Sequence, residues 1–110
     1  MTYAIEYYSE DLQQEILELP PTLLARYLSL TDRMVNAGPN LGEPHTKAFG
    51  KGLFELRLKG AEGIARVFFC TRVGQRIVIL HCFVKKDQKT PKRHKTLAEK
   101  RLKEVKDADS

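Results

Sequence analysis

Three short apolar segments, joined by tight turns, fill most of the chain between residues 53 and 84 and constrain the fold more than any other feature. The segments Leu53–Lys59, Ile64–Arg72 and Arg76–Val84 alternate in polarity or are rich in β-branched residues, which predicts strands. The connections 60–63 and 73–75 contain glycine in a context typical of turns. The pattern predicts an antiparallel meander, and the nearly continuous apolar run of the last segment favours a central position for it.

The N-terminal third predicts a strand followed by two helices. Tyr3, Ile5 and Tyr7 alternate with polar or small residues, which is typical of a half-buried strand beside the meander. Ser9 is suited to cap a short helix. A longer helix follows Pro20-Pro21, because apolar residues recur there at helical spacing: Leu23, Tyr27, Leu30 and Met34.

Residues 36–52 contain glycine, proline and asparagine and are predicted to be a loop, and Thr90-Pro91 is a suitable start for a final helix. The predicted order is therefore β-α-α-β-β-β-α. This is an α+β fold, with a small, mostly antiparallel sheet, two N-terminal helices packed on one face, and a C-terminal helix.

Length and composition predict one globular domain, residues 1–110, with 42% hydrophobic and 30% charged residues. The longest apolar run, residues 77–84, is far shorter than the roughly 20 residues of a membrane-spanning helix. Residues 1–18 contain no lysine or arginine, so we expect no signal peptide and a cytoplasmic protein. Cys70 and Cys82 lie in apolar stretches and are expected to be buried, and no metal site or cofactor is predicted.

Charge is distributed unevenly along a chain whose net charge is +5. Residues 1–18 carry −5, whereas residues 85–106 hold ten Lys or Arg against three acids, which gives +7. Lys92, Arg93 and Lys95 fall in the first turn of the predicted final helix, where cations oppose the helix dipole. A bound phosphate would make this arrangement favourable, and the alternative is an ordinary solvated basic helix.

Strand pairing predicts a row of basic side chains. A symmetric turn at 60–63 places Arg57 opposite Arg66, and the turn at Gly74 places Arg66 opposite His81 or Cys82. Like charges opposite one another are destabilising, so such a row favours an anionic ligand. Structural alternatives remain: Glu55 could neutralise part of the row, and Arg66 could pair with an acid.

Three motifs in order resemble the RelE/HigB-type toxins, and in particular their phage-derived branch. They are Gly52-Leu53-Phe54-Glu55-Leu56-Arg57, then Ile64-Ala65-Arg66-Val67-Phe68-Phe69, then Ile79-Leu80-His81-Cys82-Phe83-Val84-Lys85-Lys86-Asp87-Gln88-Lys89-Thr90-Pro91. The resemblance covers nearly the whole chain and implies a RelE/ParE-like fold. It also implies the toxin of a type II toxin–antitoxin pair that cuts mRNA on the ribosome without metal, by attack of the 2′-OH on the adjacent phosphate.

The resemblance also implies roles for individual residues. The expected catalytic residues are Arg57, Arg66, Lys85, Lys86 and His94, and the expected RNA-binding residues are Lys59, His81, Phe83, Lys89 and Lys92. The acid or base is left open between His81, His94 and a lysine. His81 and Phe83 also have a structural interpretation as core or sheet residues, and His94 as a solvated one.

The expected partners are a cognate antitoxin of helix-turn-helix type with an acidic segment, mRNA on the ribosome, and operator DNA only through the antitoxin. We expect no membrane association. Two alternatives remain for the function. One is a ParE-like toxin that inhibits DNA gyrase, and the other is a non-enzymatic basic module that binds RNA or an acidic partner.

Overall fold

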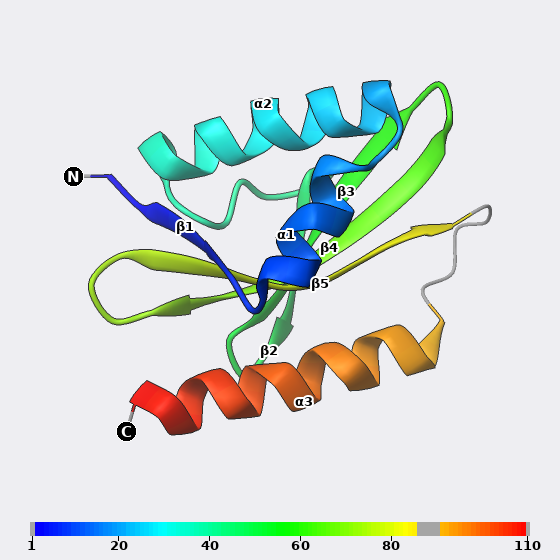
Figure 1. Cartoon of the computed structure of the whole chain (residues 1–110). Coiled ribbons are helices and arrows are strands. Elements are labelled where there is room, and N and C mark those ends of the chain that lie inside the picture. The colour runs from blue at the N-terminus through cyan, green and yellow to red at the C-terminus, as the bar shows by residue number, and fades with distance from the viewer. Residues whose placement is uncertain (1, 86–90, 110) are drawn as a thin grey trace.

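The computed structural model describes residues 2–85 and 91–109, in which helices cover both faces of a sheet (Figure 1). The elements are β1 (Ala4–Tyr7), α1 (Glu10–Leu17), α2 (Pro21–Ala37), β2 (Thr46–Gly50), β3 (Leu53–Gly60), β4 (Gly63–Arg72), β5 (Arg76–Lys85) and α3 (Lys92–Asp109). The sheet has the strand order β1-β5-β4-β3-β2. β1 runs parallel to β5 and the other neighbours are antiparallel, so the predicted α+β class and mostly antiparallel sheet are confirmed.

The prediction of a loop over residues 36–52 is wrong at its end, where β2 pairs with β3. Thr46 faces Leu56 and Ala48 faces Phe54, and a register shift follows before Gly50. Positive φ angles at Gly50, Lys51 and Gly52 turn the chain back into β3. The strand is short and flanked by glycine, so its composition resembled that of a loop.

The two N-terminal helices pack on one face of the sheet. Ser9 caps α1, its hydroxyl accepting a hydrogen bond from the Leu12 amide at 3.1 Å, and Pro21 occupies the first turn of α2. The buried positions of α2 follow the predicted helical spacing, including Tyr27 and Met34, which are 2% and 0% exposed. The predicted placement of both helices is therefore confirmed.

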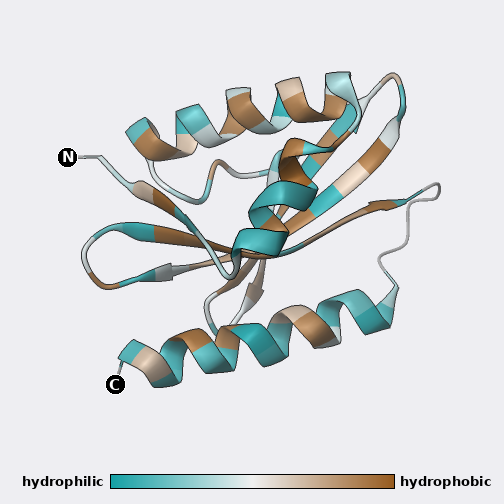
Figure 2. Cartoon of the chain, in the orientation of Figure 1, coloured by the Kyte–Doolittle hydropathy of each residue, from teal (hydrophilic) through white to brown (hydrophobic). Residues whose placement is uncertain are grey.

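The opposite face is covered by α3, whose exposed surface is mostly hydrophilic (Figures 1 and 2). Only Ala98 and Leu102 of this helix are fully buried, against side chains that include Phe68 and Leu80. Polar contacts add to this thin apolar seam: Arg101 donates to the Leu80 carbonyl at 2.8 Å. The helix therefore rests on the sheet through few apolar contacts.

Cys70 and Cys82 are buried and free, on opposite faces of the sheet, as expected of small apolar residues. Among the helices in the described part of the chain, none is both long and apolar enough to span a bilayer.

The register of the meander decides which side chains meet. Arg57 lies opposite Arg66, as predicted. The predicted partner of Arg66 on β5 is wrong, because Phe83 stands there and His81 lies opposite Phe68. The register shifts between Phe68 and Phe69, where β5 contains one extra residue, and this bulge moves every later pair by one position.

Candidate functional site

A cationic hollow of about 340 Å³ lies between the sheet and the first turns of α3. Its lining comes from β2, β3, β4 and α3, namely Lys47, Phe49, Glu55, Arg57, Arg66, Lys92 and Lys95. We call this hollow the cationic site. Glu55 is the one carboxylate among its described lining residues, so the surface strongly favours anions.

Glu55 holds the two arginines at the centre of the cationic site. Its Oε1 lies 3.3 Å from Nε of Arg57 and 3.5 Å from Nε of Arg66. Arg57 also donates to Glu43 at 2.8 Å, at the exposed rim. The expectation that Glu55 neutralises part of the basic row is thus met, yet five cations still face one carboxylate in this lining.

Arg66 is unusually buried for a guanidinium, with 9% of its side chain exposed. Within the described residues its Nε has no hydrogen-bond partner, and the nearest carboxylate oxygen given, Oε1 of Glu55, lies at the long distance of 3.5 Å. Burial lowers the pKa of Arg66 from its ordinary value, Glu55 opposes this shift and Arg57 adds to it. A buried, still charged donor of this kind costs free energy unless an anion completes its shell.

An aromatic ring separates two of the lysines. The ammonium of Lys95 lies 4.7 Å from the centroid of the Phe49 ring and that of Lys47 lies 5.3 Å from it. Such cation–π contacts hold flexible lysine side chains beside the hollow rather than free in solvent. Phe49 in turn packs against Phe68, with ring centroids 6.1 Å apart.

A pair of histidines stands at the α3 side of the sheet. His81 Nε2 and His94 Nδ1 are 2.7 Å apart and share a hydrogen bond. The His94 ring stacks on Phe83, with centroids 3.8 Å apart and planes within 3°. The bond and the stack fix the orientation of His94, and Nε2 is the ring nitrogen that this bond does not engage.

Both histidines are held towards the neutral form. Burial, then His94, then Arg101 lower the pKa of His81 to about 4, and burial and Arg93 lower the pKa of His94. The neutral form of an imidazole is the form that can accept a proton, whereas the lowered pKa makes each ring a weaker base.

Acid is expected to weaken the fold through this pair. Unfolded histidine titrates near pH 6.5 and binds a proton that folded His81 excludes down to about pH 4. The contribution of His81 to the free energy of unfolding is therefore fully present above about pH 6.5 and is lost as the pH falls towards 4. We expect urea denaturation to show about 1–2 kcal/mol less stability at about pH 4.5 than at about pH 7 from this source, allowing for partial exposure.

The matched comparison is His81→Gln, which removes the titrating group but keeps a polar side chain. Its unfolding free energy is expected to fall less steeply with acid than that of the wild-type protein. Parallel pH profiles for the two proteins would contradict this interpretation.

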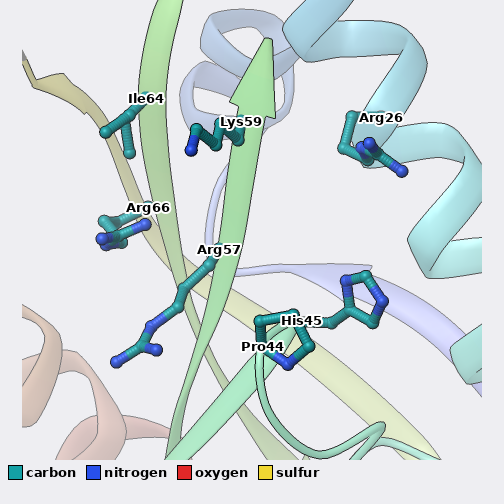
Figure 3. Close-up of a pocket in the computed structure, with 7 residues that line it drawn as sticks. All are labelled: Arg26, Pro44, His45, Arg57, Lys59, Ile64 and Arg66. Carbon is teal, nitrogen blue, oxygen red and sulfur yellow. The ribbon is translucent and has the colours of Figure 1, made fainter.

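The structure brings some of the predicted site residues together and separates others. Arg57, Arg66 and Lys92 line the cationic site, and His81, Phe83 and His94 form one stack beside it. One face of Phe83 is covered by His94. Lys85 is buried at the end of β5, opposite Ile64, and Lys59 lines a neighbouring hollow (Figure 3). The predictions for Lys86 and Lys89 lie outside the described residues.

Sequence reasoning did not single out Lys47 or Phe49, and it named Lys95 only among the cations whose arrangement a bound phosphate would make favourable. Lys95 carried a signal, as a cation in a helix first turn, but Lys47 and Phe49 fall in a segment that was expected to be a loop. Only the pairing of β2 with β3 brings them to the arginines.

No group of three or more His, Cys, Asp or Glu side chains within residues 2–85 and 91–109 is arranged to hold a metal ion. The described site presents guanidinium, ammonium and imidazole groups.

Similarity to known proteins defines first the class of fold and then the family. The structure superposes on a doubly substituted Escherichia coli toxin RelE in the free state with a TM-score of 0.67. The match covers 93% of this chain and 99% of that chain at 13% sequence identity, so it shows a common fold. No curated protein shows significant sequence similarity to the chain.

The sequence profile of the family described as phage derived protein Gp49-like matches residues 14–103. The chain belongs to this family. The resemblance to the phage-derived branch of RelE/HigB-type proteins is thus confirmed at the level of family and fold.

Proposed function

We propose that this protein is the toxin of a type II toxin–antitoxin module and cleaves mRNA on the ribosome. The observation that carries the proposal is the buried guanidinium of Arg66, with an unpartnered Nε, beside Arg57 in a hollow rich in cations. The family and the RelE fold support a toxin. A scissile phosphate is complementary to this hollow, because it carries negative charge and its oxygens accept the hydrogen bonds that the hollow can donate.

The proposed reaction is a transesterification within the RNA. The 2′-oxygen forms a bond to the adjacent phosphorus, the bond from phosphorus to the 5′-oxygen breaks, and the products are a 2′,3′-cyclic phosphate and a 5′-hydroxyl. Arg57 and Arg66 bind the non-bridging oxygens, on which charge accumulates in the phosphorane. Fixed donors aimed at developing charge are usually the largest catalytic contribution.

Proton transfer is assigned to His94. Its Nε2 accepts the proton of the attacking 2′-OH, while Nδ1 is fixed by the hydrogen bond to His81. The departing 5′-oxygen takes up a proton from water, and His94 releases its proton to solvent. His81 thus acts as a positioning residue. Lys92 and Lys95 at the start of α3 add positive charge beside the phosphate, which also offsets the unfavourable placement of cations at that helix end.

The proposed function implies further partners. A cognate antitoxin with an acidic segment would cover the cationic site through charge complementarity. We propose that it is of helix-turn-helix type and carries the pair to operator DNA. Such a toxin consists of a single domain. It acts in the cytoplasm, where mRNA and ribosomes are available.

Primer extension on a reporter transcript, after induction of the protein, tests this function. We expect new 5′ ends within translated codons, and none in a matched transcript whose start codon is destroyed. Uncut message together with arrested growth and lost supercoiling would instead indicate a gyrase inhibitor. Uncut message without an effect on supercoiling would indicate a non-enzymatic binding module.

A further inference from the structure

The cationic site is one end of a longer depression that passes around the edge of β3. A second hollow of about 310 Å³ shares Arg57 and Arg66 with the cationic site, and a third of about 320 Å³ shares Arg26 and Lys59 with the second. Because neighbouring hollows share lining residues, the three adjoin one another around this edge. We call the second and third hollows together the β3-edge track.

The track exists because β2 covers only the first half of β3. The ladder between these strands ends at Thr46 and Leu56, and a single further bond joins the Arg57 amide to the His45 carbonyl at 2.8 Å. Beyond that point the edge of β3 is uncovered, and Arg26 of α2 lies across from Lys59 (Figure 3). The remaining wall of the second hollow is formed by Pro44 and His45.

Positive charge continues along this track. Arg26 and Lys59 are both exposed, and neither forms an ion pair with a carboxylate in the part of the chain that the structure describes. The nearby acids have other partners, since Glu62 accepts hydrogen bonds from Thr22 and Glu43 from Arg57. Cations placed in sequence along a groove favour a ligand that repeats its negative charge.

We infer that the β3-edge track binds the single-stranded RNA that flanks the scissile phosphate, with Lys59 and Arg26 contacting successive backbone phosphates. This inference rests on the proposed function and adds the path of the strand to it. A strand held at Arg57 and Arg66 must leave the cationic site, and the track carries positive charge in continuity with that site. A groove around one strand edge suits a single strand, which can bend and splay, better than a wide duplex.

Binding of a non-cleavable RNA tests the track without requiring catalysis. The probe is a labelled 2′-O-methyl oligonucleotide of about 12 nucleotides, with fluorescence anisotropy recorded over a range of salt concentrations. Each phosphate contact on a single strand contributes about 0.7 to the slope of log affinity against log salt. For the double variant Arg26→Ala/Lys59→Ala we expect a slope lower by about 1.4 and an affinity roughly 25-fold lower at about 0.1 M salt.

The matched control is Arg33→Ala, which removes one exposed charge from the same helix but outside all three hollows. It is expected to keep the wild-type slope. A second probe of about 4 nucleotides is too short to fill both the cationic site and the track, so the double variant should affect it little.

Several results would overturn the inference. The first is no binding of the 12-nucleotide probe by the wild-type protein. The second is an equal loss of probe affinity and salt slope in the double variant and in the control. The third is an RNA hairpin that binds as tightly as the single-stranded probe and loses as much affinity when Arg26 and Lys59 are replaced. Unchanged RNA binding with weakened antitoxin binding would assign the track to the antitoxin instead. Failure of the proposed cleavage can be distinguished from failure of this inference. In that case the reporter message stays uncut, while the affinity of the probe still depends on its length and on the salt concentration as described.

Discussion

Replacement of Arg66 by alanine is expected to lower the rate of mRNA cleavage by at least about 100-fold, the usual loss when one preorganised donor to a developing oxyanion is removed. The reason is geometric. Arg66 is 9% exposed and offers an unpartnered Nε in the described structure, so water cannot easily replace it in the reaction. The measurement is the initial rate of appearance of new 5′ ends, at equal protein levels, by primer extension.

Two further variants separate catalysis from folding. Arg76→Ala removes an arginine near Glu6 and Asp109, outside the cationic site, and is expected to cleave at close to the wild-type rate. Arg66→Lys keeps the charge but loses the planar fork, so we expect a partial loss. Full activity of Arg66→Ala, with circular dichroism and thermal unfolding unchanged, would contradict the proposed role.

Replacement of Glu55 by glutamine is expected to cost stability. Glu55 is 2% exposed and lies against the buried Arg66, so the substitution leaves a buried guanidinium without its counter-charge. Loss of one partner from a buried ion pair typically costs about 3–5 kcal/mol. We expect a smaller loss than this, about 2–3 kcal/mol in urea denaturation, because Glu55→Gln keeps the shape and an acceptor oxygen.

Glu43→Gln is the matched control for this prediction. Glu43 forms a 2.8 Å ion pair with Arg57, but its side chain is 64% exposed, and exposed pairs contribute about 0–1 kcal/mol. Equal losses in both variants would show that Glu55 is not a buried counter-ion. At the same time Glu55→Gln should bind RNA more tightly, since it removes the carboxylate from the lining of the cationic site.

Local rules in the sequence were sufficient for the first hairpin and failed at the second. The turn at 60–63 is short and symmetric, so counting residues from it correctly paired Arg57 with Arg66. The same count from Gly74 was correct as far as Phe69 and Ile79, and Leu80 then adds one residue to β5. A bulge changes pairing without changing the alternation of residue types enough to be recognised, so Phe83 rather than His81 or Cys82 meets Arg66.

The part of the candidate site that depends on the register between β3 and β4 was predictable, and the part that depends on packing of distant elements was not. The arginines follow from the meander. The contact between His81 and His94 depends on how α3 crosses the sheet, and the approach of Lys47 and Phe49 depends on a strand whose pairing, more than its composition, defines it. Tertiary contacts of this kind leave little trace in local periodicity.

β1 has no neighbour until the last strand of the chain has been made, because its partner in the sheet is β5. The cationic site likewise needs β4 and the first turns of α3 in addition to β2 and β3, and the histidine pair needs β5 and α3. A nascent polypeptide that has emerged only as far as β3 therefore presents one of its two central arginines and no histidine pair. Under the proposed function, the RNA-cleaving site is therefore absent during most of the chain's own synthesis and is completed only near its release from the ribosome.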